Sequence, residues 1–155
     1  MTLTPQQARK EMFAKVSECW NAHAEDIVGY VPEIRWQGIE EPELPGADKF
    51  WMRAGTTNVT TRQSGHMSPD APGGSPVVYD NFGFITLQIF APMKGRESWS
   101  KGELLSELGQ RMFMASETGG GVWFRNPRIR NLNHDGTFYR WNVIADYQFS
   151  QVKGT

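Results

Sequence analysis

NLNHDGTFYRWNVIADYQF, residues 131–149, is a turn followed by a strand whose two faces differ. Apolar and polar side chains alternate along the strand, and this period of two is typical of a β-strand that covers a core with one side. We therefore expect an antiparallel sheet with one buried and one polar face. The apolar face carries Tyr139, Trp141, Val143, Ala145, Tyr147 and Phe149, and the polar face carries Arg140, Asn142, Asp146 and Gln148.

The preceding segment, VWFRNPRIR at 122–130, is expected to pair with this strand as a hairpin. A two-residue loop, Asp135-Gly136, would put Arg130 opposite the buried Trp141, whereas a three-residue loop, 134–136, puts it opposite Arg140. The longer loop agrees with burial, so we predict that register. In this interpretation His134 and Asp135 form the turn, and Gly136 supplies its positive φ.

The predicted register places three arginines, Arg128, Arg130 and Arg140, on the polar face of the hairpin. Like charges directly opposite one another destabilise a sheet. The patch is therefore either solvated or directed at an acidic partner. A neighbouring subunit is a candidate for that partner, because the chain itself carries an acidic segment with Glu40, Glu41 and Glu43.

The composition favours a single domain over residues 1–155. A chain of 155 residues is long enough to bury a core without metal or disulfide support. A net charge of −1 argues against a general polyanion binder. The one cysteine, Cys19, excludes a disulfide framework and is interpreted as a small core residue. We expect no signal peptide and no membrane span, because no apolar stretch is long enough.

Two amphipathic helices are predicted. Thr4 opens the first with a capping box that includes Pro5 and Gln7, and this helix should fade between His23 and Gly29. Ser100 is predicted to open the second with another capping box, and Gly119-Gly120-Gly121 to end it. The apolar side of the second helix is expected to contain Leu104, Leu105, Leu108, Met112 and Phe113.

Three more strands are predicted, at 34–38, 49–63 and 77–92. The segment 77–92 has apolar residues on both faces and is expected at the centre of the sheet, with both sides covered. Residues 64–76 are predicted to form a polar, mobile loop. The resulting order α-β-β-β-α-β-β indicates an α+β fold, with a mainly antiparallel sheet of four to five strands packed against two helices.

Catalytic patterns are lacking in the sequence. There is no phosphate-binding GxxxxGK[ST] loop and no GxSxG elbow. His23, His66 and His134 lie far apart in sequence, and Cys19 has no partner at zinc-ligand spacing. We therefore expect no enzyme, no catalytic residues, no metal and no cofactor.

Several segments, taken in order, resemble the bacteriophage tail-terminator family (lambda minor tail protein U-like) of long-tailed phages. After the first amphipathic helix these are IRWQG at 34–38, FWMRAG at 50–55, FGFITLQIFAPMKGRESWSKGELLSELGQRMF at 82–113 and GVWFRNPRIRNLNHDGTFYRWNVIADYQF at 121–149. The chain departs from the family in the loop 64–76 and in the acidic segment 39–48. The resemblance implies no catalytic residues.

The resemblance implies a structural role: a ring, expected to be a hexamer, that caps the tail tube, stops its polymerisation and presents a surface for head–tail joining. The implied partners are other copies of the chain, the tail tube protein and a head–tail connector or neck protein. DNA would only pass through the ring lumen, and no membrane is involved. The expected location is the tail or neck of the virion, assembled in the host cytoplasm.

The interface residues expected for this role combine the arginines and the acidic segment with the start of the loop 64–76, which would order on docking. Two alternatives remain open at this point: another neck protein, such as a head–tail joining or tail-completion component, and a small-ligand-binding α+β domain with a pocket of Trp36, Trp51 and Trp123. The expected interface residues are Arg128, Arg130, Arg140, Glu40, Glu41, Glu43, Arg62 and His66.

Overall fold

The computed structural model describes residues 2–41, 43–66 and 77–153, which form an α+β domain. The strands form one sheet in the order β1-β2-β3-β5-β4, in which β1 is parallel to β2 and all other neighbours are antiparallel. The predicted fold class and element order are confirmed, with one extra short helix. The helices are α1 (Pro5–His23), α2 (Glu25–Val28) and α3 (Ser98–Arg111), and the strands are β1 (Glu33–Trp36), β2 (Trp51–His66), β3 (Val77–Pro92), β4 (Trp123–Leu132) and β5 (Phe138–Lys153).

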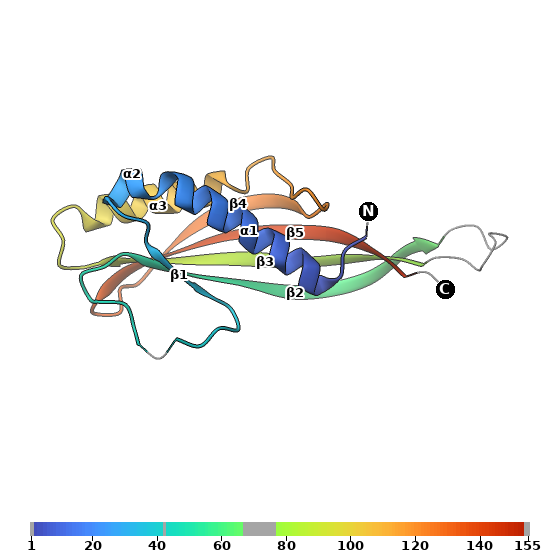
Figure 1. Ribbon diagram of the computed structural model, residues 1–155, viewed down its shortest axis with the longest axis horizontal. Coiled ribbons are helices and arrows are strands. Elements are labelled where there is room, and N and C mark those ends of the chain that lie inside the picture. Colours follow the sequence, from blue (N-terminus) through green and yellow to red (C-terminus); the bar gives the residue numbers. More distant parts are fainter. Residues whose placement is uncertain (1, 42, 67–76, 154–155) are drawn as a thin grey trace.

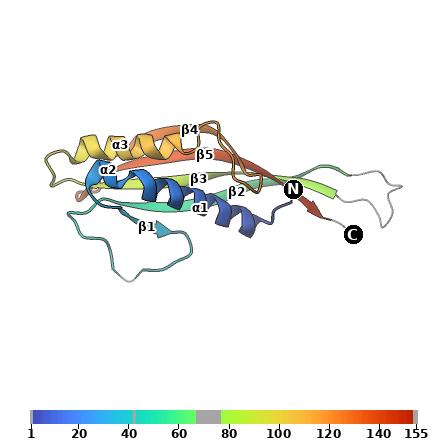
Figure 2. The ribbon, with the colours of Figure 1, turned by 45° about the horizontal axis from the view of Figure 1, so that its top comes forward.

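The helices lie together on one face of the sheet, so the molecule has two layers (Figures 1 and 2). The main core fills the space between these layers, and the strands contribute every second residue to it. In β5, for example, Trp141, Val143 and Ala145 are buried. The distal parts of β2 and β3 project beyond the helices together with the end of β5, which makes the molecule elongated (Figure 1).

The predicted start of α1 is confirmed. Gln7 donates its backbone N–H to Thr4 Oγ1 (3.2 Å), and Thr4 donates its own N–H to Gln7 Oε1 (2.9 Å). The buried stripe of α1 recurs every four residues, as expected for a helix that rests on a sheet. The C-cap of α2 is Gly29, with φ 86°, so the helical segment ends inside the predicted interval. The buried residues of α1 are Ala8, Met12, Val16 and Trp20.

The prediction for α3 was wrong at both ends. The helix begins at Ser98 rather than Ser100, and its N-cap, Glu97, makes no side-chain capping hydrogen bond. It ends at Arg111, and Gly119–Gly121 belong to a turn before β4. Leu104 is 46% exposed because the helix packs through its small residues, so the buried stripe is rotated away from Leu104. Those small buried residues are Gly102, Ser106 and Gly109.

The predicted register of β4 and β5 was wrong by two residues. Arg130 lies opposite Asn142, and Arg140 lies opposite Leu132. A shift of two preserves the side-chain alternation, so Arg130 and Arg140 still share one face, as predicted. The connection between the strands is five residues long, 133–137, rather than three.

Asp135 explains the longer connection. Its Oδ1 accepts the backbone N–H groups of Thr137 (2.9 Å) and Phe138 (2.7 Å), and Asp135 N donates to Phe138 O (3.2 Å). The pKa of this carboxyl lies below its ordinary value, and the hydrogen bond from the Phe138 N–H is the largest cause. Gly136 has φ 92°, and His134 Nδ1 accepts its N–H at 3.2 Å. The assignment of these residues to turn formation is confirmed.

β3 is the central strand, as predicted, but the helices cover only one of its faces. Ile85, Leu87 and Ile89 are fully buried beneath the helices. On the other face Phe84 and Gln88 are only half-buried, because no described helix crosses that side of the sheet (Figures 1 and 2). We call this side of the five strands the open face.

Candidate interaction surface

The open face is rich in arginine. The residues of this face are identified by the strand register and by their strict alternation with the buried positions. Carboxylates at the strand positions of this face are fewer: Glu33, Asp80 and Asp146. The arginines are Arg35, Arg53, Arg62, Arg125, Arg128, Arg130 and Arg140.

Three of the arginines that were predicted to be at an interface lie on the open face of the last two strands, Arg128 and Arg130 on β4 and Arg140 on β5. Arg128 forms an ion pair with Asp146 (Nη1 to Oδ1, 3.3 Å) and is therefore partly neutralised. Arg140 donates from Nε (2.9 Å) and Nη2 (2.7 Å) to Asn133 O. Arg130 is exposed, and within the described residues it has neither an ion pair nor a hydrogen bond from its side chain. Arg130 is thus the arginine of this set that is most available to a partner.

The edge strand β4 is also interrupted. A β-bulge separates Arg125 from Arg128, and Asn126 within it has φ 52°. Asn126 Nδ2 donates to Asp146 Oδ2 at 3.2 Å, and Pro127 has no N–H to offer. Bulges and prolines prevent unlimited strand addition at a sheet edge. Contacts at this edge are therefore expected to run through side chains rather than through a continued β-ladder.

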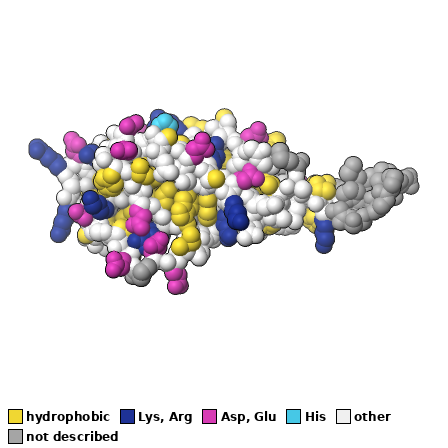
Figure 3. Space-filling view, viewed as in Figure 1, with side chains coloured by type: hydrophobic (Ala, Val, Ile, Leu, Met, Phe, Trp, Pro, Cys, Tyr) yellow, Lys and Arg dark blue, Asp and Glu magenta, His cyan; other side chains and the backbone are white. Residues whose placement is uncertain are grey.

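The predicted acidic residues lie at the opposite edge of the sheet. Glu40, Glu41 and Glu43 are exposed in the connection between β1 and β2, and Figure 3 shows acidic side chains gathered over this loop. Glu41 Oε2 is 3.9 Å from Arg35 Nη1 in the same chain. Glu41 therefore lies beside edge strand β1, whereas Arg130 lies on the other edge strand, β4, and no ion pair joins the acidic residues to Arg130 within the described chain.

The two other predicted interface residues lie on β2, toward the projecting end. Arg62 is on the open face opposite Asp80, and its guanidinium lies over the Phe82 ring at 5.4 Å. The backbone of His66 pairs with Val77 at the end of the strand, but its side chain lies outside the described residues. The predicted loop 64–76 lies outside them from residue 67 onward.

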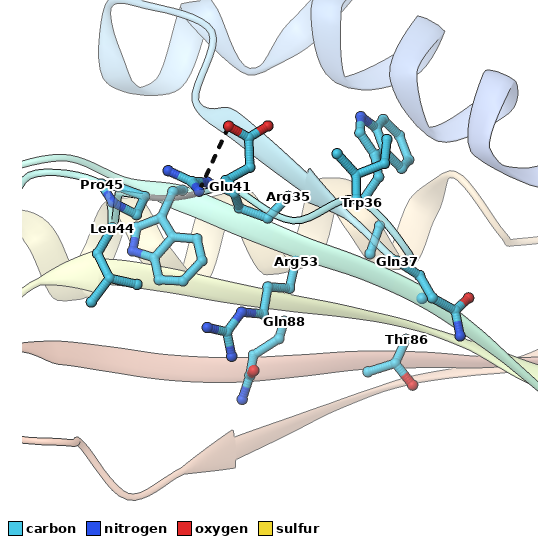
Figure 4. A pocket seen from close by; sticks show the side chains of 13 residues that line it. Arg35, Trp36, Gln37, Glu41, Leu44, Pro45, Arg53, Thr86 and Gln88 are labelled. Atoms are coloured by element: carbon cyan, nitrogen blue, oxygen red, sulfur yellow. Dashed lines mark ion pairs between the residues drawn. The ribbon is translucent and has the colours of Figure 1, made fainter.

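A groove on the open face was not predicted. It lies between the loop residues Leu44 and Pro45 and the strands, with Arg53 and Gln88 on its floor, and Figure 4 shows these two side chains lying next to each other. A second hollow of about 410 Å³ continues it toward Phe138, next to the first of about 390 Å³. The sequence held one signal for this groove, the alternation of side chains in FWMRAG. It places Phe50, Met52 and Ala54 in the core and the residues between them on the open face.

Trp51 forms the wall shared by both hollows and is only 4% exposed. Its ring stacks on Phe90, with centroids 3.9 Å apart and an interplanar angle of 5°, and Phe138 meets it edge-on. The Arg53 guanidinium lies 5.1 Å from the Trp51 ring centroid and 5.5 Å from that of Phe90. These contacts hold the guanidinium by cation–π attraction.

Three buried polar atoms on the open face have no hydrogen-bond partner in the described part of the chain: Arg35 Nε, which still lies 3.3 Å from Glu33 Oε1, Trp51 Nε1 and Asn142 Oδ1. Asn142 lies between Gln88 and Arg130 in the register. Buried polar groups in folded proteins are nearly always hydrogen-bonded, because an unpaired group loses its hydration without compensation. Water or a bound molecule must supply the hydrogen bonds of these atoms.

The predicted tryptophan pocket is not assembled as a unit. Trp36 and Trp51 both line the first hollow, but Trp123 lies on the edge strand β4 and is 59% exposed.

Cys19 is half-buried, and this burial raises the pKa of its thiol. Across residues 2–41, 43–66 and 77–153, no three His, Cys, Asp or Glu side chains are grouped so as to hold a metal ion. None of the helices described has the length and apolar character needed to cross a membrane.

Comparisons with known proteins show the fold but no family. No protein-family model and no curated protein matches the chain. A solved structure that carries only a serial designation is 16% identical, with a TM-score of 0.58 over 95% of this chain and 96% of that chain. A chain from the virion of a native gene transfer agent particle is 13% identical, with a TM-score of 0.47 over 95% and 98%. The first likeness establishes that this α+β fold occurs in another protein, and the second is too weak to bear on function.

Proposed function

We propose that this chain is a structural protein of a phage-like particle, which assembles head to tail into a closed ring and terminates a tail tube. The observation that carries the proposal is the separation of charge across the sheet. Exposed carboxylates lie beside edge strand β1, and the unpaired Arg130 lies on edge strand β4. Each copy therefore offers one complementary edge to the copy before it and the other edge to the copy after it.

Ring closure follows from the kind of contact. Two different patches on one chain produce a heterologous interface, which closes when the rotation between copies divides a full turn and otherwise grows into a filament. Electrostatic complementarity favours this orientation, because turning one copy around would bring arginine to arginine. The bulge and Pro127 in β4 oppose the alternative of unlimited strand pairing.

The tail-terminator role within this class is suggested by the ordered sequence segments that resemble that family. In the fold these segments correspond to β1, the start of β2, the β3–α3 unit and the β4–β5 hairpin. We propose that the ring contains six copies, caps the last ring of tube protein and presents its other side to a connector or neck protein. DNA would pass through the lumen, and the role requires geometry rather than catalysis.

The subunit contact can be tested by charge reversal. Arg130→Glu should weaken ring formation at least about tenfold, because an attractive pair becomes repulsive, and Glu40→Lys in the same chain should restore it. Light scattering after size exclusion and negative-stain images would report the assembled mass. Lys10→Glu, an equal charge change on the exposed side of α1, serves as the matched control. A ring of unchanged stability in Arg130→Glu would exclude this contact.

The terminator role needs a separate test in particles. Those made without this chain should carry overlong tubes that lack heads, because nothing stops tube growth. Tubes of normal length without heads would instead favour the alternative of a head–tail joining or tail-completion protein. A thermal shift with small metabolites that depends on Trp51 would favour the ligand-binding alternative.

A further inference from the structure

The groove beside Trp51 has the features of a built binding site. It is walled by apolar side chains, including Leu44, Pro45 and Phe138, and its floor carries Arg53 and Gln88. The two connected hollows, of about 390 and 410 Å³, are in the size range of ligand pockets, roughly 300–1,000 Å³. Leu44 is 79% exposed, so an apolar surface remains for an occupant to cover.

The groove holds a guanidinium, that of Arg53, which has no partner among the described residues. Trp51 is 4% exposed, and its buried Nε1 has no acceptor among the described residues. Arg53 is exposed, and within the same residues its side chain makes no ion pair. The nearby carboxylates of Glu33 and Glu41 are paired with Arg35 instead, at 3.3 and 3.9 Å.

The charge of the site favours an anionic group. A guanidinium stacked on aromatic rings keeps its N–H fork free and in a fixed plane, which suits the two oxygens of a carboxylate. Two carboxylates also line the hollows, but both have partners: Glu41 faces Arg35, and Asp135 Oδ1 accepts two backbone N–H groups of the turn. Neither carboxylate pairs with the Arg53 guanidinium in the described chain.

The shape and the amide groups favour a peptide over an isolated ion. Gln88 and Asn142 lie opposite each other in the register, on the same face as Arg53. Side-chain amides donate and accept, and therefore match the alternating N–H and C=O groups of an extended backbone. Of these two residues, Gln88 lines both hollows and offers its amide to an occupant.

We propose that this groove binds an extended segment of another protein, with an Asp or Glu carboxylate of that segment held by the Arg53 guanidinium. The side-chain amide of Gln88 holds its backbone. The loop with Glu41 and Leu44 borders both this groove and the proposed subunit contact, but Arg53 itself has no part in the contact at Arg130.

A peptide titration followed by NMR tests the site. The probe is an N-acetylated hexaglutamate peptide, and the readout is the indole N–H signal of Trp51, which is assigned by its loss in Trp51→Phe. The signal should shift with hexaglutamate and stay in place with hexaglutamine. Arg53→Gln should weaken the binding about tenfold or more, since it removes a charge-assisted pair. Lack of any shift at millimolar hexaglutamate would overturn the proposal.

Arg62→Gln is the matched control, because Arg62 also lies on the open face over an aromatic ring, but at the other end of β2. It should bind hexaglutamate like the wild type, whereas equal weakening in both variants would indicate nonspecific attraction and overturn the site. Tighter binding of oligothymidylate than of hexaglutamate would indicate a nucleic acid instead. Loss of ring mass in Arg53→Gln would assign the groove to a second copy, and each of these results would also overturn the proposal.

Discussion

Gly83 shows how a single residue can determine the packing of the sheet. It lies in β3, and a Cβ placed there would collide with Thr57 O of the neighbouring strand and lie 2.5 Å from Tyr147 Oη. The backbone carbonyl of a paired strand cannot rotate away. The position therefore requires a residue without a side chain, for reasons of space rather than of backbone conformation.

Gly83→Ala should destabilise the protein by about 1–3 kcal/mol, the usual cost of overfilling a packed site. Urea unfolding followed by circular dichroism would measure this loss. Gly55→Ala in β2 is the control, because the nearest atom to its added Cβ is 3.7 Å away, on Gln37. It should be neutral or slightly stabilising. Equal stability of the two variants would show that the sheet relaxes around residue 83.

At the level of elements, the two long helices have different starts. α1 has a complete capping box at Thr4, whereas α3 begins after Glu97 with no capping hydrogen bond from a side chain. The sequence around Ser100 has the same capping-box pattern as the sequence around Thr4, but Ser100 lies inside the helix. A capping pattern is a local signal, and the turn that leads out of β3 decides where the chain can enter α3.

Thr4→Ala should therefore cost about 1 kcal/mol of stability, because the hydrogen bond from the Gln7 N–H to Thr4 Oγ1 is lost. Ser100→Ala should change the free energy of unfolding by less than about 0.5 kcal/mol, as expected for a position inside a helix. Thermal and urea unfolding of both variants would measure the difference. A larger loss in Ser100→Ala would contradict the helix start at Ser98.

The hairpin shows how much of an element could be predicted. The assignment of Arg130 and Arg140 to one face was correct, because it depends only on a period of two. The register was wrong by two residues, because Asp135 binds the backbone of Thr137 and Phe138 and lengthens the connection. Loop length depends on which side-chain hydrogen bonds form, and several choices fit the same alternation.

For the whole molecule, the proposed assembly rests on charges at the two edges of one sheet. Such contacts are weakened by salt, because the screening length falls from about 10 Å at 0.1 M to about 3 Å at 1 M. In 1 M sodium chloride the ring should therefore dissociate at a higher protein concentration than in 0.1 M sodium chloride. Sedimentation velocity over a dilution series would measure this shift. A ring that tightens with salt would indicate an interface dominated by apolar burial instead.

The candidate site was partly predictable at this scale. The arginines of the hairpin and the acidic loop could be selected from residue type and alternation. The groove at Trp51 and Arg53 could not, because β2 and β5 contribute to it from segments far apart in the chain, and the loop at 44–45 must fold over them. The burial of Trp51 Nε1 without an acceptor among the described residues likewise could not be predicted, because it depends on the side chains packed around it.

The alternating faces of the strands, the start of α1 and the α+β class could be predicted from the amino acids alone, because these features depend on local periodicity and capping chemistry. The placement of all helices on one side, which leaves the face with Arg53 and Arg130 free of helices, could be seen only in the folded molecule. The same holds for the placement of the acidic loop and Arg130 at opposite edges. Strand order and helix placement arise from contacts between distant segments, and no local pattern specifies them.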